Sequence, residues 1–395
     1  MTERARPFLL VLYCSAGGGH RRAAEAIAEE WEARTGGRAE LVNYFARFAS
    51  PFFDAVTTYW YFRAVQYAPK LVSAFYGLMG RLRPDSLLRR AINRQGMARF
   101  RRYLAHERPE VVCCVHWTFA GTMSDLRRNG LTSVPCLTVI TDYVSHPEWL
   151  HPGVDRYCVA HALVRDGVQA RGIPSERIAV SGIPVRRQFA APHDRNAVRA
   201  RLGLAQGLPV ILVMAGAYAM LGSTGDIVKI LTRFPRPIQT LVVCGHAPRL
   251  ADRVRAAVAG SPHRFEVFGY VDNVADLMAA ADVLITKAGG VTVSEALAMH
   301  LPMLIYGSIP GQEESNTDFL IQHGAALAPG TPAEIRRTLE ALCADPDGLA
   351  AMRLAAADLG RPAAAQVVVA HLAQLTGESA PLGNRRSLDI GAAPR

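Results

Sequence analysis

Short apolar runs of strand length alternate with helical patterns along this chain, and the alternation occurs in two successive series. The runs that we predict as strands are 8–13, 40–42, 111–115, 137–140 and 156–160 in the first series, and 210–214, 241–244, 265–268, 283–286 and 303–305 in the second. Strands that alternate with helices are typical of a parallel sheet covered by helices on both faces. Two such series predict two Rossmann-like α/β domains with a cleft between them.

A polar, basic stretch that contains Pro192 and His193 separates the two series. We therefore predict an N-terminal domain over residues 1–190 and a C-terminal domain over residues 191–376. The remaining residues, 377–395, are polar and rich in Gly, Pro and Arg, which predicts a disordered tail. A chain of 395 residues, half of them hydrophobic, is long enough to bury two cores.

An aromatic-rich stretch followed by an arginine-rich one, within residues 44–108, interrupts the rhythm of the first series. Its arginines include Arg81, Arg83, Arg89 and Arg90, and the whole chain carries a net charge of +10. This order suits the headgroup region of an anionic membrane surface. The alternative interpretation is an aromatic core beside a solvated basic face. We expect no nucleic-acid partner, because no recognition motif accompanies the charge.

No apolar run is long enough to span a bilayer. The apolar residues 8–11 are of strand length and are soon followed by glycines, so we interpret them as a first strand and not as a signal peptide. We therefore expect a cytoplasmic protein that is peripheral on the inner face of the cell membrane.

The seven cysteines show neither a CxxC motif nor a Cys/His spacing typical of zinc sites, and no DxD motif ends a strand. Buried free thiols are the expected state of these cysteines. We expect no essential metal ion and no cofactor. If a diphosphate leaves during the reaction, backbone dipoles and cationic side chains must then neutralise its charge.

A glycine-rich loop, Gly17-Gly18-Gly19, separates the first strand from a helix that begins near His20. The loop is neither a Walker A motif nor a GxGxxG fingerprint. Three glycines allow a close approach, and a helix N-terminus favours an anion. His20 lies at the carboxyl edge of the sheet, where an imidazole can accept the proton of an acceptor hydroxyl. The alternative is that His20 only caps or packs.

A second turn follows the strand 283–286 and opens another helix. Its backbone amides, together with Thr292, can hold a diphosphate. Glu295, in the first turn of that helix, can accept two hydrogen bonds from a ribose diol. Alternatively, Glu295 only complements the helix dipole. The donor-site candidates of this segment are Lys287, Gly289, Gly290, Thr292 and Glu295.

Two further polar segments follow strands. Gln312 and Glu313 come after a Pro-Gly turn and suit the recognition of sugar hydroxyls, although a surface loop can look similar. Asp142, His146 and Trp149 combine an acid, an imidazole and an indole after a strand of the first series.

These four elements, in this order, resemble the pattern of the monogalactosyldiacylglycerol synthases and the bacterial processive diacylglycerol glucosyltransferases. The matching segments are 17–21, 141–149, 287–297 and 309–313, and the resemblance extends from about residue 8 to about residue 360. It implies a GT-B fold, in which an N-terminal acceptor domain and a C-terminal donor domain face a cleft. It also implies an inverting transfer of glucose or galactose from a UDP-sugar to 1,2-diacylglycerol without a required metal ion.

The resemblance further implies roles for single residues. His20 faces the reaction centre, Glu295 binds the ribose, and Gln312 and Glu313 contact the donor sugar. The backbone near Tyr270 and Val271 faces uracil, Gly18 and Gly19 contribute to donor binding, and Asp142, His146 and Trp149 lie on the acceptor side. The family usually has another glycine-rich loop after the strand 210–214, where this chain keeps only Gly216 and Gly222. Gly216 is our candidate for a phosphate contact there.

Three alternative functions share this fold or its ligand. One is the transferase that adds N-acetylglucosamine to a polyprenyl-linked murein precursor. Another is a UDP-sugar 2-epimerase, which would convert the nucleotide sugar without an acceptor and needs no membrane patch. The third is a non-catalytic nucleotide-sugar sensor, which could dispense with His20.

Overall fold

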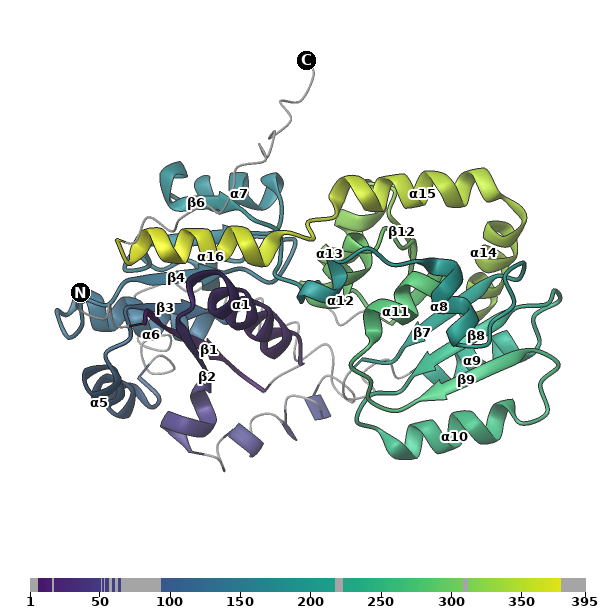
Figure 1. Ribbon diagram of the computed structural model, residues 1–395, viewed down its shortest axis with the longest axis horizontal. Helices are drawn as coiled ribbons and strands as arrows, with labels where there is room; N and C mark the ends of the chain where they lie inside the picture. The colour runs from purple at the N-terminus through teal and green to yellow at the C-terminus, as the bar shows by residue number, and fades with distance from the viewer. Residues whose placement is uncertain are drawn as a thin grey trace, which may run out of the picture.

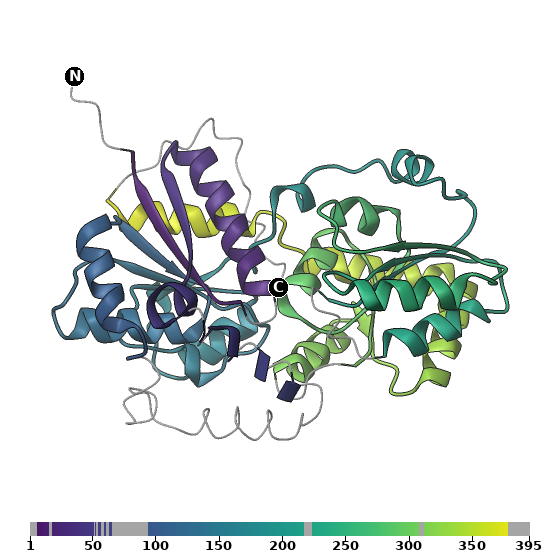
Figure 2. The same cartoon turned by 90° about the horizontal axis from the view of Figure 1, so that it is seen from below.

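The protein folds into two α/β halves, each built on a parallel sheet (Figure 1). The computed structural model describes residues 6–15, 18–50, 52, 54–56, 59–60, 63–64, 94–216, 223–307 and 312–377. The sheets face each other across the middle of the molecule (Figure 2). This is the GT-B arrangement, and the predicted fold class is confirmed.

The N-terminal sheet has six parallel strands in the order β2-β1-β3-β4-β5-β6. Its strands are β1 (Phe8–Tyr13), β2 (Arg38–Asn43), β3 (Val111–Cys114), β4 (Cys136–Val139), β5 (Arg156–Val159) and β6 (Ile178–Val180). β1 lies between β2 and β3, and Leu9 pairs with Val111 on β3. Both faces of β1 are buried, which is why its sequence is continuously apolar.

The C-terminal sheet also has six parallel strands, in the order β12-β11-β10-β7-β8-β9. Its strands are β7 (Val210–Met214), β8 (Gln239–Val243), β9 (Arg264–Phe268), β10 (Val283–Thr286), β11 (Met303–Ile305) and β12 (Ala326–Leu327). The predicted strands of both series are confirmed. Two strands were not predicted: β6, which is only partly buried, and β12, which has 2 residues.

Helices cover the faces of both sheets. The N-terminal half contains α1 (Gly19–Thr35), α5 (Met97–Glu107), α6 (Trp117–Arg128) and α7 (Ala162–Gln169), with the short helices η1 (Phe45–Ala49), η2 (Pro147–Trp149), η3 (Ser175–Arg177) and η4 (Arg187–Phe189). The rest of the chain contributes α8 (Arg195–Arg201), α9 (Thr224–Thr232), α10 (Pro248–Val258), α11 (Val274–Ala280), α12 (Gly290–Ala298), α13 (Gln312–Gln322), α14 (Pro332–Ala344), α15 (Pro346–Leu359) and α16 (Ala364–Leu375).

The last helix returns to the first sheet. α16 crosses from the C-terminal half and lies beside α1 (Figures 1 and 2). Val368 and Leu372 of α16 share a buried cluster with Leu9 of β1 and Trp31 of α1. The division at residue 190 placed all of 191–376 in the second domain, whereas α16 packs in the N-terminal core. Its apolar face needs a partner, and the strand–helix rhythm does not say which sheet provides it.

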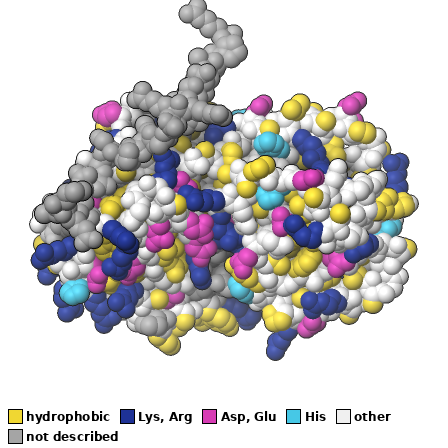
Figure 3. Space-filling view, viewed as in Figure 1, with side chains coloured by type: hydrophobic (Ala, Val, Ile, Leu, Met, Phe, Trp, Pro, Cys, Tyr) yellow, Lys and Arg dark blue, Asp and Glu magenta, His cyan; other side chains and the backbone are white. Residues whose placement is uncertain are grey.

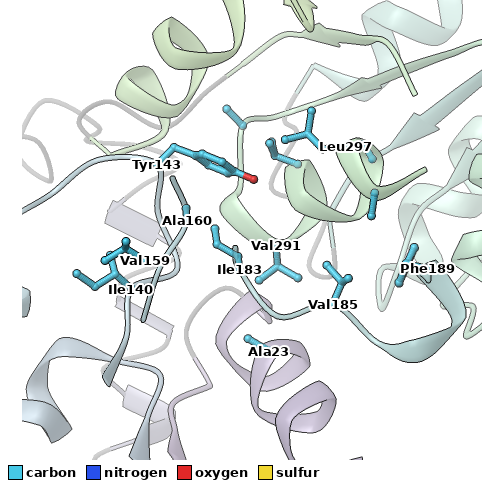
Figure 4. Close-up of a cluster of buried hydrophobic side chains, with 14 of the residues drawn as sticks. Ala23, Ile140, Tyr143, Val159, Ala160, Ile183, Val185, Phe189, Val291 and Leu297 are labelled. Atoms are coloured by element: carbon cyan, nitrogen blue, oxygen red, sulfur yellow. The ribbon is translucent and has the colours of Figure 1, made fainter. Parts of the chain in front are cut away.

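The two halves share an apolar contact surface (Figure 4). Tyr143, Ile183 and Val185 of the N-terminal part pack in one cluster with Val291 and Leu297 of α12. All five are buried. The two halves are therefore joined by a buried hydrophobic cluster.

The aromatic stretch divides between core and surface. Tyr44 and Phe48 are buried and pack with Phe100 of α5 and Phe119 of α6. In contrast, the side chains of Phe52 and Trp60 are 78% and 65% exposed. The alternative interpretation, an aromatic core, is therefore correct for the first aromatic residues of this segment. Arg81, Arg83, Arg89 and Arg90 lie outside the described residues.

Basic side chains gather where α5 lies, at the end of the N-terminal half (Figure 3). The exposed arginines of α5 are Arg99, Arg101 and Arg102. None of the helices in the described part of the chain is both long and apolar enough to cross a membrane. All seven cysteines are free, as predicted.

Candidate active site between the two sheets

The candidate site lies where α1 and α12 begin, with the end of β4 beside them. A Cβ added to Gly19 would lie 3.5 Å from Cγ2 of Val291, so the two helix starts are in near contact. A Cβ on Gly290 would overlap the carbonyl oxygen of Thr141, so only glycine lets the backbones approach this closely. Gly18 precedes α1 with a φ of 75°, the left-handed region that favours glycine. The glycines of both motifs therefore bring the halves together.

His20 points toward the end of β4. Its Nδ1 lies 3.3 Å from the hydroxyl oxygen of Thr141. Burial lowers the pKa of His20 to about 4, and the carbonyl of Val115 only partly offsets this effect. The imidazole is therefore neutral near physiological pH, which is the form that can accept a proton.

His116, which was not among the predicted site residues, lies next to His20. The ring centroids of His20 and His116 are 5.0 Å apart, and the planes are nearly perpendicular at 85°. His116 caps α6 by accepting a hydrogen bond from the backbone N–H of Thr118 at 3.3 Å. Burial and the nearby His20 hold the pKa of His116 well below its usual range. His116 directly follows the predicted strand 111–115, and this position could have marked it as a site candidate.

Cys14, His20 and His116 form a potential ligand group for a cation. Their ligand atoms all lie within 4.8 Å of one another. A thiolate and two neutral imidazoles suit a soft cation such as Zn²⁺. A cation bound there would occupy the imidazole of His20 and compete with its use as a base.

Asp142 lies in the same region and is buried. Burial raises its pKa to about 6, and the nearby Glu313 adds to this effect. The side chains of Asn316, Lys287 and Trp149 favour the ionised form and limit the rise. Lys287 and Glu313 form an ion pair with each other. Residues from the acceptor-side and donor-side motifs thus meet around one buried carboxyl group.

The segment after β4 is tied to the other half by hydrogen bonds. The backbone N–H of Tyr143 donates to Oδ1 of Asn316 at 2.8 Å, and Nδ2 of Asn316 donates to the carbonyl of Ala288 at 3.0 Å. The Tyr143 hydroxyl lies 2.9 Å from Oγ of Ser294 on α12. Asn316 ends the polar segment that contains Gln312 and Glu313, but it was not among the predicted site residues.

The remaining acceptor-side candidates are placed differently. Trp149 is buried, with its ring 6.4 Å from that of His116 between centroids. His146 lies near Arg171, and burial and this arginine lower its pKa. Asp142 and Trp149 therefore lie near His20 and His116, whereas His146 lies beside α7.

Glu295 is 2% exposed, and its Oε1 has no hydrogen-bond partner among the described residues. Burial raises its pKa to about 7, against the opposing charges of Arg22 and Arg186. The prediction that Glu295 lies in the first turn of its helix is wrong, because α12 begins at Gly290 and Glu295 lies in the second turn. The helix-dipole effect is confined to the first turn, so it does not account for this buried carboxylate. A buried, unpaired oxygen is costly and fits a group that a ligand completes.

The other donor-side candidates surround the start of α12. Gly289 caps this helix without a side-chain hydrogen bond, so its first N–H groups remain available to an anion. Gly216 follows β7 with a φ of 81°. Residues 217–222 lie outside the described residues. Val271 packs against the core, and the ring of Tyr270 stacks on His246 at 4.1 Å. Gln312 begins α13, but its side chain lies outside the described residues.

Comparison with known proteins matches the two halves to two families. Residues 20–185 match the monogalactosyldiacylglycerol (MGDG) synthase family, and residues 220–358 match the glycosyltransferase family 28 C-terminal domain. The processive diacylglycerol beta-glucosyltransferase of Bacillus cereus (strain AH187) is 28% identical over 363 residues, which cover 92% of each chain. The resemblance predicted from the motifs is confirmed.

Solved structures agree on the fold. MurG of Acinetobacter baumannii superposes with a TM-score of 0.64 at 16% identity, covering 93% of this chain and 99% of its own. The UDP-GlcNAc 2-epimerase of Neisseria meningitidis bound to UDP-GlcNAc gives a TM-score of 0.59 at 11% identity, covering 93% and 100%. A glycosyltransferase of Rickettsia africae also superposes, with a TM-score of 0.52 at 12% identity, covering 95% and 100%. The fold alone therefore does not choose between a transferase and an epimerase.

Proposed function

We propose that this chain, which is related to the diacylglycerol-dependent glycosyltransferases over nearly its whole length, is an inverting hexosyltransferase. It moves glucose or galactose from a UDP-sugar to 1,2-diacylglycerol at an anionic membrane surface. The observation that carries the proposal is the position of His20, whose half-buried, neutral imidazole lies 3.3 Å from the Thr141 hydroxyl at the junction of the two halves. A sensor that only binds a nucleotide sugar has no need for such a base.

In the proposed reaction, His20 takes the proton of the acceptor hydroxyl as its oxygen attacks the anomeric carbon of the sugar. The bond from that carbon to the diphosphate breaks, and UDP leaves with the electron pair. Attack on the face opposite the leaving group inverts the anomeric configuration. Thr141, 3.3 Å from Nδ1, orients the ring.

The C-terminal half binds the donor. Glu295 accepts hydrogen bonds from the ribose hydroxyls, which would satisfy its unpaired buried oxygen. The open N-terminus of α12 receives the diphosphate. Glu313, which is paired with Lys287, contacts the sugar in this proposal. We propose no essential metal ion, because these dipoles and cations can neutralise the leaving group.

The acceptor is insoluble in water, so the N-terminal half has to reach a bilayer. Exposed aromatic side chains, Phe52, Tyr59 and Trp60, lie on the same half as the basic α5. Aromatic rings suit the headgroup boundary, and arginines suit lipid phosphates. This combination supports peripheral attachment to an anionic membrane.

The test is incubation of the protein with labelled UDP-glucose, UDP-galactose and UDP-N-acetylglucosamine, each with diacylglycerol vesicles, with a polyprenyl-linked precursor, or without an acceptor. Lipid chromatography and nucleotide-sugar analysis follow. The proposal predicts hexosyl-diacylglycerol. Label on the polyprenyl lipid would favour the murein-precursor transferase, and an epimerised nucleotide sugar without any glycolipid would favour the epimerase.

A further inference from the structure

The starts of α1 and α12 form an open anion-binding position between the two halves. Neither helix has a side-chain hydrogen bond at its N-cap or an acidic residue in its first turn. Their first turns lie in near contact, as the approach of Gly19 to Val291 shows. Two positive helix ends without a counter-charge repel each other, so their convergence favours an anion between them.

A cationic side chain from the acceptor half lies at this position. Nη1 of Arg22, on the first turn of α1, is buried and has no hydrogen-bond partner among the described residues. Its guanidinium carbon lies 5.6 Å from the ring centroid of Tyr270, in the loop after β9. The charge of Arg22 also acts on Glu295 of α12 and opposes the rise of its pKa. Arg22 therefore lies between the ribose candidate and the expected uracil loop.

Arg22 acts on Glu295, yet among the described residues neither Nη1 of the arginine nor Oε1 of the glutamate has a hydrogen-bond partner. Leaving both atoms unsatisfied in the interior is costly. The neighbouring Arg21 behaves differently, because its Nε donates to Glu25 at 2.8 Å on the surface. A ligand that fits between Arg22 and Glu295 has to offer acceptors to one and donors to the other.

A nucleoside diphosphate offers both groups, since its ribose hydroxyls donate and its phosphate oxygens accept. We propose that Arg22 binds the diphosphate of the donor from the acceptor half, as a positioning and charge-neutralising residue. This inference rests on the proposed function and deepens it. A guanidinium can hold two phosphate oxygens at once, so donor binding would lock the halves together without a metal ion.

The test compares variants in calorimetry with UDP and with uridine. Arg22→Gln is expected to weaken UDP binding about 10- to 100-fold, the range for hydrogen bonds to charged groups, and to leave uridine binding unchanged. Arg22→Lys keeps the positive charge but loses the paired N–H donors of the guanidinium. Its affinity for UDP should therefore lie between that of the wild type and that of Arg22→Gln. Arg21→Gln, which removes an equal charge one residue away, should change neither affinity. Thermal unfolding checks that each variant folds. If Arg22→Gln does not fold, the UDP and uridine affinities of Arg22→Lys decide the test.

Two outcomes would overturn the inference while leaving the proposed function standing. One is UDP binding by Arg22→Gln as tight as by the wild type. The other is an equal loss of UDP and uridine affinity, which would show that Arg22 only supports the structure. A wild-type protein that binds no UDP would overturn both the inference and the proposed function.

Discussion

The Tyr143 hydroxyl lies 2.9 Å from Oγ of Ser294 and joins the segment after β4 to the helix that carries Glu295. Both groups are buried, and the phenol pKa is raised to about 12, mainly by burial. The N-terminal and C-terminal halves are thus connected directly beside the candidate site.

Removing this hydrogen bond should loosen the junction of the halves. Tyr143→Phe is expected to lower the free energy of unfolding by about 0.5–1.5 kcal/mol, the usual net contribution of such a bond. Ser294→Ala should act similarly, although Ser294 also donates to the carbonyl of Gly290 at 2.8 Å. Urea unfolding of both single variants and of the double variant gives the interaction free energy between the two hydroxyl groups. Fully additive losses would show that the hydroxyls do not interact.

Donor binding should depend on pH through Glu295. Its pKa of about 7 in the free protein means that acid keeps this carboxyl group protonated. The ionised form accepts the ribose hydrogen bonds, so affinity for UDP-glucose should rise between about pH 5 and about pH 8. Glu295→Gln should weaken binding by roughly 1.5–3 kcal/mol and remove this pH dependence. Calorimetry at several pH values measures both effects. An unchanged pH profile in the variant would assign the dependence to another group.

The strands and the two glycine motifs could be predicted because their signals are local. Apolar runs predicted the buried strands, and the turns before His20 and Glu295 predicted helix starts at the carboxyl edges of the sheets. Contacts between distant segments could not be predicted in this way. The approach of His116 to His20 and of Asn316 to Tyr143 depends on how strands and halves pack in space.

The aromatic stretch shows a similar limit. Tyr44 belongs to the core, whereas Trp60 is exposed, although both lie in one run of aromatic residues. An aromatic ring suits a protein core and a membrane interface equally well, so composition alone does not separate them.

Attachment to membranes should depend on Arg81, Arg83, Arg89 and Arg90. Replacing all four with Gln should weaken sedimentation with anionic vesicles, because each basic residue contributes about 1 kcal/mol near such a surface. Activity on a detergent-dispersed acceptor should fall much less, and salt should weaken wild-type binding.

The matched control for this loss of charge is a second quadruple Arg→Gln variant. It uses exposed arginines of the C-terminal half, on α10 and α14: Arg249, Arg253, Arg336 and Arg337. Its vesicle binding should stay close to that of the wild type. Equal losses in both variants would attribute the attachment to net charge and not to the region of residues 44–108.

Chelation should leave the transfer reaction intact. EDTA is expected to have no effect, whereas added Zn²⁺ should inhibit by occupying Cys14, His20 and His116. Cys14→Ser should relieve the inhibition while the reaction without zinc continues. Activity that is lost with EDTA and restored by a metal ion would contradict a metal-independent reaction.

The role of His20 is tested most directly by comparing the wild type with His20→Ala on diacylglycerol vesicles with a labelled UDP-hexose. Label in the extracted lipid gives the transfer rate, and calorimetry with UDP gives donor affinity in the same preparations. The variant should lose on the order of 10²- to 10⁴-fold in rate, the usual contribution of a general base, and keep its affinity for UDP. A variant that transfers hexose to diacylglycerol at the wild-type rate would contradict the assignment of His20 as the base.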